Sequence, residues 1–172
     1  DYYPRNRGFT PPDAYLQHLK ADVVFVMFGY NESFDNKPDD YVKKLTALVK
    51  NIRATKPNGK DFPRIVLFSP IAHEDLGDRN LPNGKANNKR LAAYAEATKK
   101  AAEETGTAFV DLFTFSKALY ESESEPLTMN GIHLTENGNK HLGEVIVSEL
   151  FGQVVVAKPE MERIREAVLD KN

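Results

Sequence analysis

The sequence predicts an α/β domain, a three-layer α/β/α sandwich around a parallel β-sheet. Three short runs, residues 21–29, 64–70 and 107–112, are mostly apolar and rich in β-branched and aromatic residues, as buried strands are. Longer segments with apolar residues at helical spacing alternate with these runs. Such alternation is typical of parallel strands joined by crossover helices. We therefore expect a parallel sheet with helices on both faces.

The first half of the chain contains two predicted helices and two predicted strands. Thr10, followed by two prolines and an acidic residue, indicates the start of a helix that ends near residue 20. The run ADVVFVMFG over residues 21–29 is nearly continuous, so we expect a strand that is covered on both faces. Apolar residues at helical spacing predict a helix over residues 38–55. A turn then leads to the second strand, RIVLFSP, over residues 64–70.

The second half repeats the pattern after a long loop. An alanine-rich helix is expected over residues 89–105, and the strand TAFVDL follows it over residues 107–112. A short helix is expected at residues 115–120. Thr135 has the character of a helix cap, and the last core helix is expected from Thr135 to about residue 151.

Composition limits the class of protein. The 172 residues suit one domain, which we place at residues 1–156, with a polar helical tail or linker at residues 157–172. The 23 basic and 25 acidic residues are well mixed, without the basic stripe that nucleic-acid binding requires. No apolar run reaches the roughly 18 residues that span a bilayer. Cysteine is absent, so disulfides and thiolate metal sites are excluded, but the compartment stays open, extracytoplasmic locations included.

Three loops follow the predicted strands, and they contain most of the polar, turn-rich residues. In an open parallel sheet, ligands bind beyond the carboxyl ends of the strands. One loop contains GYNES, from Gly29 to Ser33, and another contains NGIHLTENG, which begins at Asn130. The sequence therefore predicts that any site lies where these two segments meet. Asn31 and His133 are expected at the same edge of the sheet, close enough for one small substrate to contact both.

The two segments, in this order and at these strand ends, resemble motifs of the SGNH (GDSL-type) hydrolase family. The family's Gly-x-Asn-Asp motif resembles Gly29-Tyr30-Asn31-Glu32, and its Asp-x-x-His motif resembles residues 130–133. The segment LFSPIAHED is similar to the equivalent segment of bacterial members, in particular large planctomycete-like proteins. The resemblance covers roughly residues 21–151. It implies a flavodoxin-like sandwich that cleaves acyl or acetyl esters of carbohydrates or lipids, without a cofactor or a metal.

The resemblance also implies roles for particular residues. Gly29 would let the chain turn sharply and bring Asn31 close to the substrate, where its amide would stabilise an oxyanion. His133 would act as the general base toward a serine. Glu32 has two open roles, loop solvation and orientation of Asn31. Asn130 stands where the family has an aspartate; a neutral amide can fix an imidazole tautomer but cannot stabilise imidazolium as a carboxylate does.

The chain departs from the family at the nucleophile. It has no Gly-Asp-Ser motif, and none of its serines stands in a nucleophile-elbow context such as Gly-x-Ser-x-Gly. We therefore expect an N-terminally incomplete domain, whose first strand and serine lie outside this chain. Asp111 or Glu32 could replace the missing triad acid. Two function classes stay open: a serine ester hydrolase acting on a small, carbohydrate-linked ester, and a non-catalytic module that binds carbohydrate or a partner domain.

The remaining histidines have simpler interpretations. His73, Glu74 and Asp75 are consecutive, and a metal site is conceivable there, but one histidine beside two acids in a loop is usually polar surface. We therefore predict no metal site. His18 and His141 are expected on solvated helix faces.

Overall fold

The sheet is parallel, as the sequence predicts. The computed structural model describes residues 11–152 and 158–171. Within them, the sheet has the order β1 (Val23–Met27), β2 (Arg64–Phe68), β3 (Ala108–Val110), and both strand pairs are parallel. Because the strands are parallel, the loops that follow β1, β2 and β3 all leave from the same edge of the sheet. The two motif segments lie in loops of this edge or packed against them.

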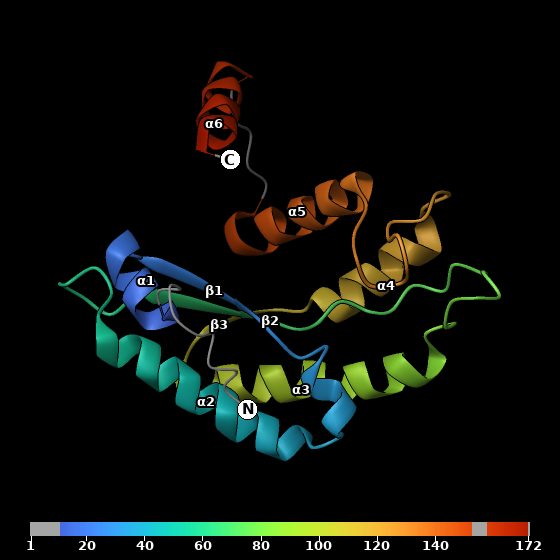
Figure 1. Cartoon of the computed structure of the whole chain (residues 1–172), viewed down its shortest axis with the longest axis horizontal. Helices are drawn as coiled ribbons and strands as arrows, with labels where there is room; N and C mark the ends of the chain where they lie inside the picture. Colours follow the sequence, from blue (N-terminus) through green and yellow to red (C-terminus); the bar gives the residue numbers. More distant parts are fainter. Residues whose placement is uncertain (1–10, 153–157, 172) are drawn as a thin grey trace.

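Helices lie on both sides of the sheet, which confirms the predicted α/β class. In Figure 1, α2 and α3 run below the sheet, α4 and α5 lie on its other side, and α6 stands apart at the top. The helices of the described residues are α1 (Pro12–Leu19), α2 (Pro38–Thr55), α3 (Lys85–Thr105), α4 (Leu112–Ser122), α5 (Glu136–Phe151) and α6 (Lys158–Lys171), with a short 3₁₀ helix η1 (Glu32–Asp35).

The larger core lies between the sheet and helices α2 and α3. On α2, Tyr41, Leu45 and Val49 are spaced four residues apart, so they face the same side, and all three are buried. The alanine-rich side of α3 packs against them, since small side chains allow the two helices to approach closely. On the sheet, Val26 and Leu67 complete this cluster.

A second core lies on the opposite face and is built mainly from β2, β3 and α5. Val66, Phe68 and Val110 point to this side and pack against Leu112 and Leu142. This cluster joins the sheet to the middle and the end of α5. It therefore fixes the helix that follows the second motif.

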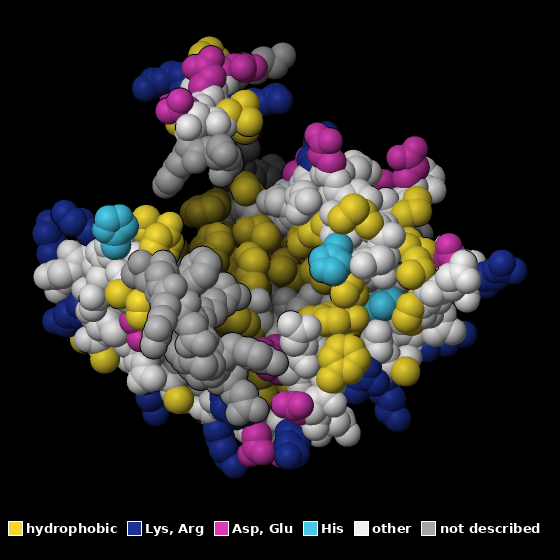
Figure 2. All heavy atoms as spheres, viewed as in Figure 1, with side chains coloured by type: hydrophobic (Ala, Val, Ile, Leu, Met, Phe, Trp, Pro, Cys, Tyr) yellow, Lys and Arg dark blue, Asp and Glu magenta, His cyan; other side chains and the backbone are white. Residues whose placement is uncertain are grey.

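The expectation that the first strand is covered on both faces is wrong for β1. Val23, Phe25 and Met27 alternate along one face of the strand and are 43%, 46% and 52% exposed. The physical reason is position: β1 is an edge strand, and the α5 cluster reaches β2 and β3 instead. Figure 2 shows the resulting apolar hollow at the centre of the molecule.

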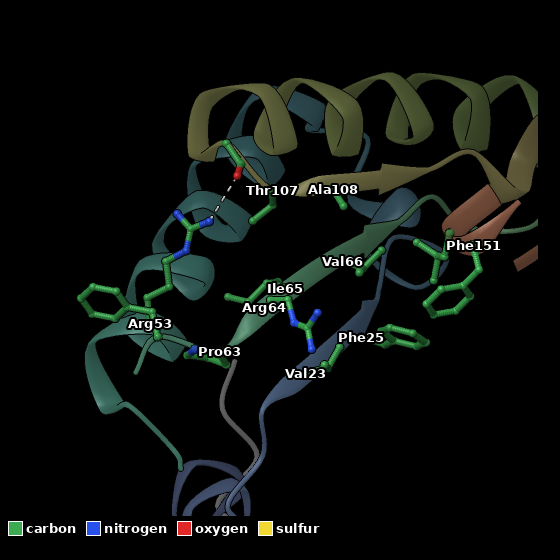
Figure 3. Close-up of a pocket in the computed structure, with 13 residues that line it drawn as sticks. Val23, Phe25, Arg53, Pro63, Arg64, Ile65, Val66, Thr107, Ala108 and Phe151 are labelled. Carbon is green, nitrogen blue, oxygen red and sulfur yellow. Dashed lines mark hydrogen bonds between the residues drawn. The ribbon is translucent and has the colours of Figure 1, made fainter. Parts of the chain in front are cut away.

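A cavity of about 640 Å³ opens on this apolar face. Val23, Arg64 and Thr107 line it near the starts of the three strands, and Phe151 closes it from α5 (Figure 3). The amino ends of the strands are the edge opposite to the motif loops. The cavity is therefore separate from the candidate site.

Some helix boundaries differ from the predictions for local reasons. Helix α3 begins at Lys85 rather than residue 89, because Gly84 adopts a positive φ of 74° and serves as its N-cap. Helix α4 begins at Leu112 rather than residue 115, because the Asp111 carboxylate caps it by accepting the N–H of Thr114. The predicted cap Thr10 lies outside the described residues. No helix in the described part of the chain has the length and hydropathy of a membrane span.

Candidate active site

The first motif loop, residues 29–36, turns sharply at Gly29. This glycine is buried and has φ +122°, and a Cβ there would lie 3.1 Å from Cδ of Pro70 and 3.3 Å from the hydroxyl of Tyr41. Its N–H donates to the Glu32 carboxylate at 2.8 Å. Glu32 therefore closes the turn by binding the backbone of Gly29. No hydrogen bond between Glu32 and Asn31 occurs among the described residues.

Asn31 begins the short helix η1 and is exposed. It is the N-cap residue of η1, but its side chain makes no capping hydrogen bond. Ser33 is buried beside it, and its hydroxyl donates to the carbonyl of Tyr30 at 2.6 Å. The loop thus positions the Asn31 amide at the surface, where it can meet a ligand.

The second motif loop, residues 127–135, folds as a narrow hairpin that ends at the cap of α5. Thr128 and Leu134 form an isolated antiparallel bridge, and the N–H of Met129 donates to the carbonyl of His133 at 2.7 Å. The Thr135 hydroxyl accepts the N–H of Gly138, so Thr135 is the α5 cap, as predicted. The hairpin places the His133 side chain at its exposed tip.

Asn130 and His133 form a turn closed by a side chain. The Asn130 Oδ1 accepts the backbone N–H of His133 at 3.0 Å and of Ile132 at 3.3 Å. The His133 Nδ1 lies 3.1 Å from Oδ1 and 3.0 Å from Nδ2 of the same amide. If Nδ1 carries the proton it donates to Oδ1, and if it is unprotonated it accepts from Nδ2. Asn130 therefore orients the ring but admits both neutral tautomers.

Neither Asp111 nor Glu32 contacts His133. The Asp111 carboxylate accepts hydrogen bonds from Thr114 and from the Ser69 hydroxyl, and Glu32 binds Gly29. Within residues 11–152 and 158–171, the only side chain hydrogen-bonded to His133 is that of Asn130. Neither predicted substitute for the triad acid is therefore in contact with it.

The buried serines of the described chain are likewise engaged elsewhere. Ser33, Ser69 and Ser116 are buried, and their hydroxyls bond to Tyr30, Asp111 and Ala72 respectively. None of the serines in the described ranges forms a hydrogen bond with His133. The expectation that the nucleophilic serine lies outside this chain stays a prediction.

His73 lies between the two motif loops. It is 5% exposed, its Nδ1 is 3.1 Å from the hydroxyl of Tyr30, and a Cβ on Gly131 would lie 2.7 Å from its Cδ2 and 2.9 Å from its Cε1. One imidazole thus touches the residue before Asn31 and the glycine two residues before His133. The expectation that His73 is polar surface is wrong, because the loop after β2 folds beneath both motifs.

The tautomer of His73 is set by its neighbours. Its Nε2 lies 3.2 Å from the carbonyl of Pro82, which can only accept, so Nε2 carries the proton. Its Nδ1 then accepts from Tyr30 and from the Asn87 amide, whose oxygen is bonded by Arg90 at 2.6 Å. Burial raises the pKa of the Tyr30 phenol, while the Asn87 hydrogen bond and the Arg90 charge lower it. Tyr30 is therefore a neutral donor to His73.

Two further residues belong to this network: Asn88, which was not singled out in the sequence, and Glu74, which was expected to be polar surface. Asn88 clamps the backbone of His73, accepting its N–H at 2.7 Å and donating to its carbonyl at 2.8 Å. Glu74 is buried against the second motif loop rather than solvated. Their only sequence signal is their place after a strand end, which does not separate them from ordinary loop residues. In the part of the chain that the structure describes, no group of three acids or histidines could hold a metal ion.

Comparison with known proteins gives consistent matches. The chain matches the GDSL-like Lipase/Acylhydrolase family over residues 5–141. A catalytic serine-to-alanine mutant of an acetylxylan esterase from Geobacillus stearothermophilus has a TM-score of 0.62 at 22% identity, covering 82% of this chain and 64% of the esterase. An α/β hydrolase enzyme from the metagenome of Lake Arreo, Spain, has a TM-score of 0.61 at 22% identity, covering 80% and 63%.

These matches extend over only part of the known structures. The chain spans less than two thirds of the length of either one. Further structures of the same esterase are catalytic mutants in which an aspartate or a histidine is replaced by alanine. No curated protein sequence matches the chain.

Proposed function

The chain belongs to the GDSL-like lipase/acylhydrolase family, and we propose that it forms part of a serine ester hydrolase with His133 as general base. The observation that carries this proposal is the packing of both motif loops against His73. Tyr30 and Gly131 contact opposite parts of that ring, so the Asn31 and His133 segments are held by one rigid group. A site assembled from distant loops over a common support suits catalysis.

The proposed reaction uses a serine supplied from outside residues 1–172. The His133 Nε2 accepts the serine proton as the hydroxyl oxygen attacks the ester carbonyl, and the Asn130 Oδ1 holds the proton on Nδ1. The Asn31 amide donates to the oxyanion of the tetrahedral intermediate. His133 then returns the proton to the departing alcohol, and water repeats the sequence to release the acid. The Gly29 N–H is bonded to Glu32, so Gly29 contributes the turn rather than a donor.

The substrate that we propose is a small acyl ester, most simply an acetyl ester on a carbohydrate. Support comes from the similar structures, which include acetylxylan and acetyl-xylooligosaccharide esterases. The exposure of both Asn31 and His133 also suits a substrate whose bulk stays in solvent.

One observation favours a second candidate function, a non-catalytic module that binds carbohydrate or a partner domain. Asn130 admits either tautomer of His133, so part of the histidine population has its proton on Nε2 and cannot accept one there. In a related triad, an amide in place of the carboxylate lowers the rate by about 10⁴-fold. A protein with such a triad could keep the fold and lose the hydrolytic activity.

An active-site label distinguishes the two functions. The longest natural polypeptide that contains residues 1–172 is treated with a fluorophosphonate, which reacts with an activated serine, and the labelled peptide is identified by mass spectrometry. We expect one labelled serine outside residues 1–172, together with saturable hydrolysis of p-nitrophenyl acetate.

The matched histidine variants complete the test. His133→Ala should abolish both labelling and hydrolysis, whereas His18→Ala, which removes an exposed histidine of α1, should change neither. Labelling of a serine within residues 1–172 would place the nucleophile elsewhere in the site. Absence of both label and hydrolysis would reject the hydrolase and leave the binding module.

A further inference from the structure

Glu74 is a buried carboxylate to which the proposed reaction gives no part. It is 6% exposed, its Oε1 accepts the N–H of Leu127 at 3.0 Å, and its Oε2 accepts the N–H and hydroxyl of Thr128 at 2.7 and 2.6 Å. All three partners are donors, which is the arrangement that a carboxylate requires. Among the described residues no basic side chain forms a salt bridge with it. Backbone and hydroxyl dipoles of the second motif loop therefore stabilise its charge.

A second set of hydrogen bonds connects Glu74 to Gly131. The Thr128 hydroxyl, which donates to Glu74, also accepts the N–H of Gly131 at 3.0 Å. The backbone N–H of Glu74 donates to the carbonyl of Gly131 at 2.9 Å. Both polar backbone groups of Gly131 are thus tied to Glu74, one through Thr128 and one directly.

Gly131 lies inside the turn that orients His133. The turn is closed by bonds from Asn130 to the two residues after Gly131, so the direction of the Gly131 peptide sets where the imidazole points. The ring of His73 also packs against Gly131. The turn is therefore fixed by the consecutive residues His73 and Glu74.

Other roles for Glu74 fit less well. Both of its oxygens are occupied by loop donors, so neither is free to transfer a proton to a substrate. It belongs to no cluster of three possible metal ligands in the described residues. The remaining role is structural: Glu74 is connected by hydrogen bonds to the turn that orients His133.

We propose that Glu74 is a positioning residue that holds His133 in its catalytic orientation through Thr128 and Gly131. The inference rests on the proposed role of His133 as general base. A carboxylate is suited to this task because it accepts three donors at once and its hydrogen bonds are stronger than those of a neutral group. A carboxamide cannot replace it, since its NH₂ would face at least one donor of the loop.

The first test compares Glu74→Gln with Asp75→Asn, its exposed neighbour, which contacts the backbone of Gly77 instead of the second motif loop. Hydrogen exchange is measured in the longest natural polypeptide that contains residues 1–172. In Glu74→Gln we expect the exchange rates of the amides of residues 127–131 to rise, relative to the parent protein, by a factor at least tenfold larger than the factor for the β2 amides. In Asp75→Asn we expect no difference between the two regions. Equal changes in both regions of Glu74→Gln would overturn the proposal.

A hydroxyl pair tests the connection itself and leaves the Glu74 side chain in place. Thr128→Val removes the hydroxyl that joins Glu74 to Gly131, and Thr128→Ser keeps it. We expect the ¹⁵N resonances of the His133 ring to shift in Thr128→Val and to return in Thr128→Ser. Ring resonances that are identical in all three proteins would overturn the proposal.

Kinetics separates positioning from general stability. For p-nitrophenyl acetate, Glu74→Gln should lower kcat at least tenfold with KM within twofold, while Asp75→Asn retains both. A kcat within twofold of the parent would overturn the positioning role. If the parent protein has no esterase activity, the proposed function fails, and the exchange and ring resonance measurements still decide whether Glu74 orients His133.

Discussion

The two motif loops are held in place in different ways. In the first motif loop, Glu32 binds the N–H of Gly29, and Ser33 binds the carbonyl of Tyr30, so each bond spans three residues. The second motif loop depends on Glu74, whose carboxylate binds residues 53 and 54 positions later in the chain. Tyr30 of the first loop also contacts the distant His73, and Asn130 closes the second loop locally, but the carboxylate that anchors each loop is local in the first and distant in the second.

This difference has a consequence for mutation. A locally bonded loop can keep its shape while the surrounding structure relaxes, because its partners move with it. A loop bonded to a buried, distant segment loses its shape when either partner moves. Substitutions at equivalent positions should therefore lower the free energy of unfolding more in the second motif loop than in the first.

Alanine at the two turn glycines should produce the largest contrast. At Gly131, φ is +91° and a Cβ would overlap the buried ring of His73, so we expect Gly131→Ala to lower the free energy of unfolding by about 4 kcal/mol. At Gly29, φ is +122° and the nearest atoms, of Pro70, are 3.1 Å away, so Gly29→Ala should lower it by about 2 kcal/mol. Urea denaturation followed by circular dichroism measures both.

A helical glycine provides the control for this pair. Gly143 lies within α5, and a Cβ at this residue would meet nothing within 4 Å, so Gly143→Ala should raise stability by up to about 1 kcal/mol. If Gly29→Ala proves as costly as Gly131→Ala, the two loops do not differ in the way that their contacts indicate.

Alkaline pH should weaken the support of both loops. Tyr41 lies beneath Gly29, and burial raises its pKa to about 12, with smaller effects of Thr98, Glu32 and Tyr94. In the unfolded chain tyrosine titrates near 10. Above that pH the unfolded state loses the proton first, so the folded state loses stability as pH rises from about 10 to about 12. The loss for Tyr41 is about 2 to 3 kcal/mol.

Tyr120 gives the matching measurement beside the segment, residues 72–74, that anchors the second loop. Its hydroxyl donates to the carbonyl of Ala72, and burial, followed by the charge of Glu74, raises its pKa. Each of the variants Tyr41→Phe and Tyr120→Phe should make the free energy of unfolding less dependent on pH above 10. Below pH 10 the pH dependence should equal that of the parent protein. A decline parallel to that of the parent in both variants would show that neither phenol carries the alkaline sensitivity.

The smallest effect concerns the His133 ring. Asn130→Asp replaces an amide that can donate to Nδ1 by a carboxylate that can only accept, so the neutral ring should shift toward the tautomer with its proton on Nδ1. The turn should persist, because the carboxylate still accepts the N–H groups of Ile132 and His133. The ¹⁵N shifts of the ring at mildly alkaline pH report the tautomer populations.

His73 serves as the internal control for Asn130→Asp. Its tautomer is set by the Pro82 carbonyl, so its ring shifts should not change. An unchanged His133 tautomer would mean that Asn130 does not govern the ring. A full-length Asn130→Asp protein with a higher kcat would add support for the base role of His133.

The sequence by itself determined the order and type of the elements and the positions of the two motifs. Residues 38–55 form α2 as predicted, since proline begins that helix and its apolar spacing is regular. Thr135 caps α5 for an equally local reason. Each of these features depends on residues a few positions apart, which is the range over which helical periodicity, capping and turn chemistry operate.

The tertiary structure alone decided the surroundings of those motifs. Nothing near Glu74 indicates that residues 127–128 bury it, and nothing in β1 indicates that one of its apolar faces stays open. Burial depends on which segments pack together, and a sequence pattern records the apolar character of a residue but not its partner. Asn130 orients the His133 ring from three positions away, but the contacts of Glu74 with residues 127 and 128 join positions more than fifty residues apart, so only the folded chain brings them together.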